Sequence, residues 1–362
     1  MRVLAVTTCS DRPEAETFIG LKQKGVDIEV MCSTESLFYQ HLKDSGVTVT
    51  DFEVRGRIDL PAIQAIRRRL TAGRFDILHG FNNQTISNAL LAATGLPVKV
   101  IAYRGIVSNV SFFNPGSWMT YLHPKVDHVI CVAEAVRQYF LNMRFLWMRL
   151  PPEKFITIYK GHSLDWYQAQ PKDLSEFGIP EHAFVVGCIT NYRPRKGIEV
   201  LVEAARYLPP DAPVHFLLVG HMGSAKLAKH IEQSPMKNRI HLTGYRLDAP
   251  ALMASCDAYV LPALRREGLP KGVIEAMAYG VPPVVTDSGG SPELIEDGIS
   301  GLIVPPGDPG AIGAALRQLL DQPDLRRRMG KNAQKRIRTH FCIEDTINNT
   351  LILYKQLVPE RG

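Results

Sequence analysis

The sequence predicts an α/β protein built from two doubly wound, Rossmann-like domains with a cleft between them. Its 362 residues are many for a single hydrophobic core. In each half, short apolar runs alternate with amphipathic stretches, as in parallel sheets that are covered by helices. The alternation starts again at Ala183, after a polar, proline-containing segment at 168–180. We interpret this segment as the linker between the domains.

The composition is that of a soluble globular protein, with 45% hydrophobic and 22% charged residues. The formal net charge of +6 suits an anionic partner, such as nucleotide phosphates, anionic lipid or nucleic acid. Six scattered cysteines without a C-x-x-C pair indicate reduced thiols in a cytoplasmic protein. We find no signal sequence and no apolar run of about 20 residues, so we expect contact with a membrane at most, without crossing it.

The first half begins with the order strand, loop, helix, strand. Strands are predicted at 2–7 and 27–32, with a helix at 14–24 between them. In this order, the loops that follow the strands gather at one edge of a parallel sheet. Arg12 lies in the first such loop. It is either a donor to a substrate or a solvated surface arginine.

Two further strands are predicted at 74–80 and 98–103, each with polar residues at its end. We interpret His79 either as a residue that faces the cleft or as a structural histidine. Tyr103 and Arg104 stand at the next strand end, where a cation is suited to bind a phosphate or an acceptor.

The segment 109–122 is irregular and aromatic, and we predict that it contacts an acceptor, with Trp118 as a binding residue. A strand at 127–132 follows.

Two basic, apolar segments are candidates for contact with a membrane surface. The segment 55–74 has six arginines, and its part 60–70 has the apolar spacing of an amphipathic helix. The alternative is a solvated helix face. The segment 136–150 combines large apolar residues with three arginines. We interpret it as a helix that is either packed in the core or in contact with lipid or a lipid-linked acceptor.

The second half opens with a strand at 183–190, a loop rich in cations and a helix at 198–208. A departing phosphate group gathers negative charge, and nearby cations lower the barrier to its departure. A strand at 213–220 ends in a glycine turn, and the segment 239–245 ends in an aromatic residue.

The central stretch of the second half reads as strand, short loop and helix. The apolar run 257–262 is the predicted strand, and 272–279 is the predicted helix. A helix start offers free N–H groups and the positive end of the helix dipole, which suits a phosphate. Lys271 in this first turn is electrostatically misplaced unless an anion joins it. Glu275 can accept hydrogen bonds from a sugar diol.

Glu267 and Glu275 resemble the Glu-x7-Glu signature of retaining glycosyltransferases of family GT4, which have the GT-B fold. The resemblance extends downstream, where 281–295 is similar to the family pattern G-x-P-V-V-x-T-x-x-G-G-x-x-E and 297–308 is similar to its next conserved run. The loop at 191–197 resembles the family's G-R-x-x-x-x-K-G phosphate loop.

This resemblance implies an enzyme that moves a hexose-type sugar from a nucleotide diphosphate to an acceptor hydroxyl. Glu275 would hold the ribose hydroxyls, and Glu267 would contact the donor sugar. The implied catalytic residues are Glu267, Lys196 and Arg104. The implied donor-binding residues are Glu275, Arg193, Arg195, Asn191, Gly268, Leu269, Pro270, Lys271, Gly220 and Tyr245. The implied acceptor-binding residues are Arg12, His79, Tyr103 and Trp118.

The sequence departs from the family pattern at two places. Asn191 stands where the phosphate loop usually has an arginine, and Arg193 or Arg195 is expected to replace that charge. Tyr103 and Arg104 stand where many relatives have a histidine, which puts the role of that histidine in doubt here.

Several other chemistries lack their motifs. No G-x-G-x-x-G followed by an acidic residue is present, which argues against a dehydrogenase. No Asp-x-Asp and no Cys/His set with metal spacing occur, so we expect no cofactor and no metal. The expected partners are a nucleotide sugar, a saccharide or lipid-linked acceptor and an anionic membrane surface, without nucleic acid.

The resemblance assigns 1–165 to acceptor binding and 166–342 to nucleotide-sugar binding, with a helix at about 343–362 that packs back on the first domain. The acceptor is expected to be a lipid-linked or surface-polysaccharide intermediate at the inner face of the cytoplasmic membrane. Two alternatives stay open. One is a GT-B nucleotide-sugar epimerase or phosphorylase, and the other is a catalytically weak scaffold that binds nucleotide sugars.

Overall fold

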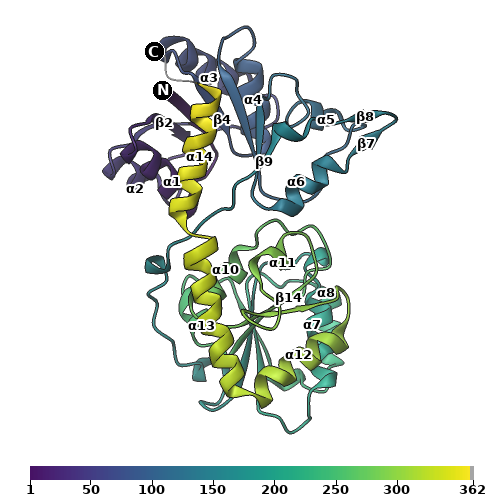
Figure 1. The fold of residues 1–362 in the computed structure, drawn as a ribbon. Helices are drawn as coiled ribbons and strands as arrows, with labels where there is room; N and C mark the ends of the chain where they lie inside the picture. Colours follow the sequence, from purple (N-terminus) through teal and green to yellow (C-terminus); the bar gives the residue numbers. More distant parts are fainter. Residues whose placement is uncertain (359–362) are drawn as a thin grey trace. The chain divides into compact units, whose positions relative to one another are not determined.

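The computed structural model of the protein describes residues 1–358. The chain forms two compact units (Figure 1). Unit 1 comprises Met1–Gly161 together with the C-terminal segment that begins at Phe341, and unit 2 comprises His162–His340. The domain boundary predicted from the sequence, at 165/166, lies a few residues later.

A seven-stranded parallel sheet forms the centre of unit 1, in the order β3-β2-β1-β4-β5-β6-β9. Its central strands are buried apolar runs, which is typical of strands covered by helices on both faces. Because all strands are parallel, the loops that follow them meet at one carboxyl edge. The strands are β1 (Arg2–Val6), β2 (Asp27–Cys32), β3 (Thr48–Asp51), β4 (Ile77–Gly80), β5 (Lys99–Arg104), β6 (His128–Cys131) and β9 (Phe155–Thr157).

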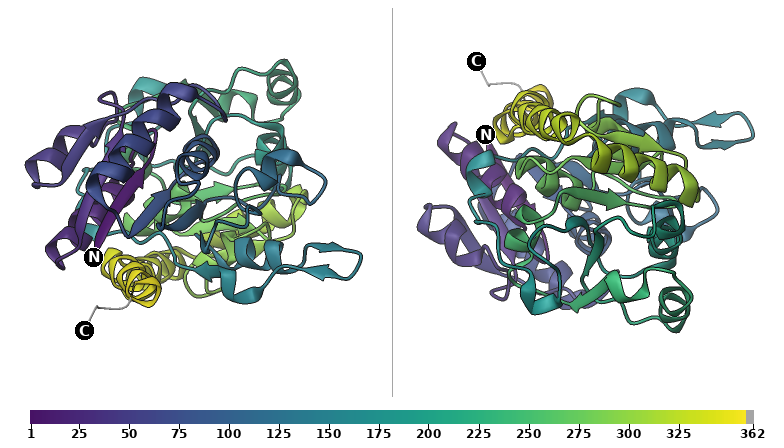
Figure 2. Two further views of the ribbon diagram at one scale, coloured as in Figure 1. Left: turned by 90° about the horizontal axis from the view of Figure 1, so that it is seen from above. Right: turned by 90° about the horizontal axis from the view of Figure 1, so that it is seen from below.

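Helices flank this sheet (Figure 2), and several of them begin at a residue whose side chain caps the helix. The Asp11 carboxylate accepts a hydrogen bond from the Glu14 N–H at 3.1 Å, and Asp59 caps the basic helix α3 in the same way. The helices are α1 (Arg12–Gln23), α2 (Tyr39–Asp44), α3 (Leu60–Gly73), α4 (Asn83–Ala92), α5 (Pro115–Trp118), α6 (Glu134–Leu141), the 3-10 helix η1 (Pro152–Lys154) and α14 (Ile343–Leu357).

The C-terminal helix α14 completes unit 1, as Figure 1 shows in yellow. It packs along α1, where Ile347 lies so close to Gly20 that an added Cβ would be 2.2 Å from its side chain. The Thr346 hydroxyl bonds to the Gly161 N–H and the Tyr159 carbonyl, both at 2.8 Å. A segment far along the chain therefore covers a face of the first sheet.

The predicted helix at 136–150 is wrong beyond its first half. Helix α6 ends at Leu141, and the chain turns into an antiparallel hairpin of β7 (Arg144–Phe145) and β8 (Met148–Arg149). The reason is a tertiary contact: the Phe145 ring packs against Phe112 and Phe113, which are distant in sequence. Such a contact outweighs the local helical preference of an apolar run.

A six-stranded parallel sheet forms the centre of unit 2, in the order β12-β11-β10-β13-β14-β15. Its core consists of apolar side chains from the strands and the covering helices. The strands are β10 (Phe184–Ile189), β11 (Val214–Val219), β12 (Ile240–Gly244), β13 (Ala258–Leu261), β14 (Pro283–Thr286) and β15 (Leu302–Val304).

The helices of unit 2 alternate with its strands, as in a doubly wound fold. They are α7 (Ile198–Ala204), α8 (Ala225–Glu232), α9 (Ala249–Ala254), α10 (Lys271–Ala278), α11 (Ser291–Leu294), α12 (Pro309–Asp321) and α13 (Pro323–His340). Short 3-10 helices are η2 (Leu164–Trp166), η3 (Ser175–Phe177), η4 (Pro194–Lys196), η5 (Ala205–Tyr207) and η6 (Lys237–Arg239).

The segment 168–180, predicted as the linker, is part of unit 2. The Lys172 N–H donates to the Ser255 hydroxyl at 2.7 Å, and Leu174 is buried. The sequence pattern was polar because the segment lies on the surface of the unit, not because it connects the units.

Candidate functional site

Three loops meet at the carboxyl edge of the sheet of unit 2. They follow β10, β13 and β14, and hydrogen bonds between backbone groups connect them. The Leu264 N–H donates to the Arg195 carbonyl at 2.8 Å, and the Gly290 N–H donates to the Glu267 carbonyl at 3.2 Å. At Gly197, whose φ is +66°, an added Cβ would be 2.1 Å from the Pro262 carbonyl oxygen. Only glycine fits this close approach.

Glu267 lies at the centre of these loops and is 5% exposed. One carboxylate oxygen is 2.9 Å from Arg195 Nη1, and the other is 3.1 Å from Lys196 Nζ. Because one carboxylate faces two cations, this group of three side chains has a surplus positive charge. A buried charge is stable only when it is paired, so the triad holds its members in fixed positions.

Helix α10 starts directly after this loop. Gly268 and Pro270 are buried and Leu269 is half-buried, which places the loop against the body of unit 2. The first N–H groups of an α-helix, here those of Lys271 and Gly272, have no partner within the helix and can bind an anion.

The Lys271 side chain is exposed and pairs with Glu275 at 3.2 Å, one turn further on. The Glu275 side chain is 22% exposed. The start of α10 packs closely on the sheet at Gly272. A Cβ added there would be 2.5 Å from the hydroxyl of Tyr259, a residue of β13.

Asn191 and Gly220 bring a second pair of loops together. The Asn191 side-chain oxygen accepts from the His221 N–H at 3.0 Å. Gly220 has a φ of +127°, and an added Cβ would be 2.2 Å from the Thr190 carbonyl oxygen. Arg193 is exposed, whereas Arg195 is half-buried against Glu267. Of the two arginines considered as a replacement for the charge missing at Asn191, the structure brings Arg195 to Glu267.

Tyr245 lies at the end of β12 and is 63% exposed. Its ring stacks on His221, with 5.6 Å between the centroids and 13° between the planes. The two rings make a flat aromatic surface from two neighbouring loops, one of which carries the predicted donor-binding residue Tyr245.

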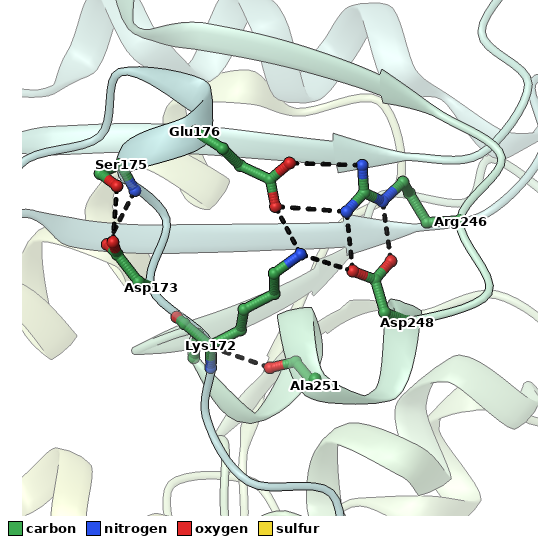
Figure 3. Close-up of polar contacts among 8 residues, drawn as sticks. Lys172, Asp173, Ser175, Glu176, Arg246, Asp248 and Ala251 are labelled. Atoms are coloured by element: carbon green, nitrogen blue, oxygen red, sulfur yellow. Dashed lines mark hydrogen bonds and ion pairs between the residues drawn. The ribbon is translucent and has the colours of Figure 1, made fainter.

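An ion-pair network fixes the residue after Tyr245 (Figure 3). The Arg246 guanidinium donates to both Asp248 oxygens at 2.7 Å and pairs with Glu176 at 3.2 Å. Lys172 Nζ approaches both carboxylates as well. The hydrogen bonds from Arg246 and Lys172 hold the pKa of Asp248 well below its usual range. This network ties the entry segment of unit 2 to the loop that presents Tyr245.

Two buried serine hydroxyls near this edge were not among the predicted site residues. Within residues 1–358, Ser288 Oγ and Ser291 Oγ have no hydrogen-bond partner. They flank the pair Gly289–Gly290. Gly289 has a φ of +59°, and an added Cβ there would be 2.0 Å from the Glu267 carbonyl oxygen. The glycine pair after β14 indicated this loop in the sequence. No sequence pattern indicated that the two serine hydroxyls would be buried there.

In unit 1, His79 is enclosed by the C-terminal helix. It is 2% exposed, and its Nδ1 is 2.7 Å from the Tyr354 hydroxyl. Burial lowers the pKa of His79 to about 3. The ring lines a cavity of about 30 Å³, which has room for one water molecule. Of the two interpretations of His79, this geometry favours the structural histidine.

A second group of polar residues lies beside this cavity. Lys160 Nζ bonds to Asp11 at 2.7 Å and lies 5.6 Å from the centre of the Tyr103 ring. Burial raises the pKa of Tyr103 and raises the pKa of Glu14 to about 7. Arg12 is exposed at the same sheet edge and is 3.9 Å from Glu16.

Arg104 and Trp118 have different environments. Arg104 is 4% exposed, and its guanidinium donates to the carbonyls of Ile106 and Ser108 and lies over the Tyr121 ring. This arrangement favours a structural role in the loop after β5, and its catalytic role stays a prediction. Trp118 is 43% exposed, and its indole N–H donates to the Phe112 carbonyl at 2.9 Å.

Within each unit, the predicted residues lie at strand ends, in the loops that follow the strands, or on the helices α1, α5 and α10. Among residues 1–358, no three His, Cys, Asp or Glu side chains are placed to hold a metal ion together. Over the same residues, each helix is too short or too polar to pass through a bilayer.

Comparisons with known proteins agree with this arrangement. The family model described as "Glycosyltransferase Family 4" matches residues 16–166, and the one described as "Glycosyl transferases group 1" matches residues 169–336. The UDP-Gal:alpha-D-GlcNAc-diphosphoundecaprenol alpha-1,3-galactosyltransferase of Escherichia coli is 24% identical over 369 residues, which cover 96% of this chain and 93% of the relative.

Two solved structures have the same fold. A glycosyltransferase from Rickettsia africae ESF-5 has a TM-score of 0.82 at 16% identity, over 99% of each chain. Anabaena HepE in complex with UDP-glucose has a TM-score of 0.79 at 20% identity, over 98% of this chain and 100% of the other.

The two parallel sheets and their neighbours define the class as α/β proteins of the GT-B fold. The chain belongs to the glycosyltransferases of family 4 and is a glycosyltransferase. The resemblance and the fold class inferred from the Glu-x7-Glu stretch are thereby confirmed.

Proposed function

We propose that the protein is a retaining, metal-independent transferase that moves a hexose-type sugar from a nucleotide diphosphate to an acceptor hydroxyl. The observation that carries this proposal is the triad of Glu267, Arg195 and Lys196 beside the start of α10. Its surplus positive charge and the first amides of the helix suit a diphosphate.

Each member of the site has a proposed role. Lys196 and Arg195 stabilise the negative charge that the leaving diphosphate gathers, together with the backbone N–H groups of Gly268, Leu269 and Lys271. Glu267 holds these cations in place and contacts the donor sugar. Glu275, which is half-buried on α10, accepts hydrogen bonds from the ribose hydroxyls. Tyr245 and Gly220 lie beside the base.

Unit 1 is proposed to bind the acceptor, a lipid-linked or surface-polysaccharide intermediate at the inner face of the cytoplasmic membrane. The Escherichia coli relative is named for a diphosphoundecaprenol-linked substrate, which supports this class of acceptor. Arg12 and Trp118 are exposed and suited to direct contact with the acceptor. Tyr103 is half-buried and His79 is buried, so their proposed contribution to acceptor binding is indirect.

Two substitutions test the donor site. Lys196→Ala and Glu275→Ala should each lower transfer by about 100-fold or more, because each removes a group that contacts the donor. Lys237→Ala, which removes an exposed lysine of the same unit, serves as the control. Full activity in both site variants would contradict the assignments.

Thermal-shift measurements with UDP, GDP, ADP and CMP identify the base, and the two site variants should lose the response of the wild type. Incubation with and without acceptor then separates transfer from the alternatives. An epimerase would change the donor sugar without acceptor, and a phosphorylase would need inorganic phosphate.

A further inference from the structure

Unit 1 presents a group of large apolar side chains that the proposed transfer reaction does not use. The hairpin β7–β8 projects from the rest of unit 1 (Figure 1 and Figure 2). Leu146 and Trp147 form its tip and are 73% and 85% exposed. Phe113, 77% exposed, packs edge-on against Phe145 at the base of the hairpin, 5.0 Å between centroids. We call Phe113, Phe145, Leu146 and Trp147 the hairpin patch.

The turn at the tip contains a leucine in the left-handed region of backbone conformation. Two-residue hairpin turns need residues with positive φ, and glycine, asparagine or aspartate usually fill them. Here Leu146 has a φ of +55°, although its side chain makes this conformation unfavourable. A strained residue that is also exposed indicates that the tip requires an apolar side chain more than a relaxed turn.

Both charged residues of the hairpin, Arg144 and Arg149, are positive. Arg144 and Arg149 stand directly opposite each other in the hairpin register, although like charges in that position repel. Between residues 141 and 152 the sequence has these two arginines and no acidic residue, and between 105 and 124 it has no acidic residue, lysine or arginine. A surface of negative charge would relieve the repulsion, and residues 141–152 contain no carboxylate that does so.

We propose that the hairpin patch inserts into the headgroup region of an anionic bilayer, with Arg144 and Arg149 against the lipid phosphates. Aromatic side chains such as Trp147 are favoured at the boundary between lipid tails and water, and arginines at an anionic surface add affinity. This inference makes the membrane contact of the proposed function specific, but it rests on unit 1 alone and does not depend on the donor site.

The test measures sedimentation of the full chain with vesicles of phosphatidylcholine, either alone or mixed with phosphatidylglycerol. The wild type should bind the phosphatidylglycerol vesicles. Leu146→Ser combined with Trp147→Ser should lower the partition coefficient by about tenfold or more, because the apolar tip is lost. Arg144→Gln combined with Arg149→Gln should lower it by about tenfold or more on these vesicles alone.

The matched control is Leu37→Ser combined with Leu247→Ser, which changes two leucines that are 87% and 88% exposed outside the patch. It should bind like the wild type. In a variant that keeps Trp147 as its only tryptophan, the emission should shift to shorter wavelength with phosphatidylglycerol vesicles, which tests insertion without changing the hairpin.

Three results would each overturn the proposal. The wild type could bind both kinds of vesicle equally, the serine variant could bind as well as the wild type, or the Trp147 emission could stay unshifted. The thermal shift with nucleotide, measured in parallel, reports the donor site separately, so that a failure there is distinguishable from a failure of membrane binding.

Discussion

At the scale of single residues, unit 1 contains two buried groups whose titrations have opposite effects on stability. Burial raises the pKa of Glu14 from 4.5 to about 7, against the opposing charge of Lys160. Burial lowers the pKa of His79 from 6.5 to about 3. The folded state therefore favours a protonated Glu14 and a neutral His79.

The pH dependence of Glu14 can be measured. Between about pH 4.5 and 7 the folded state binds more protons than the unfolded state, so this residue makes the free energy of unfolding fall as the pH rises. The loss is complete above pH 7 and is on the order of 3 kcal/mol. Glu14→Gln should remove this dependence and be more stable than the wild type at pH 8.

Chemical unfolding of both proteins between pH 5 and 8 checks this expectation, with Glu35→Gln, an exposed residue of the same unit, as the control. Parallel profiles for the wild type and Glu14→Gln would show that burial does not govern this carboxyl group. The contribution of His79 has the other sign, because stability is lost as the pH falls below 6.5.

At the scale of elements, close backbone contacts help to position the loops after β10, β13 and β14. Gly197 and Gly289 have positive φ and stand against carbonyl oxygens of the β13 loop. The β14 loop thus supports Glu267 from behind, and the β10 loop supplies its cationic partners. The geometry of the triad therefore depends on two glycines that are not part of it.

Gly289→Ala tests this dependence. The new Cβ would be 2.0 Å from the Glu267 carbonyl oxygen, so the loop must move. Gly298→Ala is the matched control, because its φ is +73° and no atom lies within 4 Å of the new Cβ. Both variants should lose about 1–2 kcal/mol from the left-handed backbone. Gly289→Ala should lose more, and only it should impair transfer strongly. Equal stability and activity of the two would refute the supporting role.

At the scale of the whole molecule, the chain returns to unit 1 through α14 after unit 2 is complete. Unit 1 is therefore unfinished until the last helix is in place. Ile347 on this helix is 8% exposed against α1, whereas Ile352 on the same helix is 53% exposed. Tyr354 supplies the hydrogen bond to His79.

We expect Ile347→Ala to destabilise unit 1 by about 2–4 kcal/mol, because it leaves a cavity between α14 and α1. Ile352→Ala, on the solvent side, should change stability by less than about 0.5 kcal/mol. Hydrogen exchange reports on each unit separately. In Ile347→Ala, the amides of the sheet of unit 1 should exchange faster than in the wild type, and those of unit 2 should exchange at the same rate. Similar exchange in both variants would mean that α14 is not part of the core of unit 1.

Most of the fold and part of the candidate site could be predicted from short motifs in the sequence. Strand–loop–helix alternation gives a parallel sheet, and the carboxyl edge of such a sheet collects its loops. The cations at Arg195 and Lys196 and the carboxylate at Glu267 could be named as candidates because each lies in such a loop. Their pairing could not be deduced, since it depends on how two loops approach each other across the sheet edge.

What the sequence alone determined was the α/β class, the division into two units and the family, because these rest on periodicity and local motifs. The tertiary structure alone decided the end of α6 and the hairpin that follows, since a contact between Phe145 and the loop at Phe112 outweighs local preference. It also decided that His79 and Arg104 are enclosed, because their partners, such as Tyr354, are brought to them only when the chain folds.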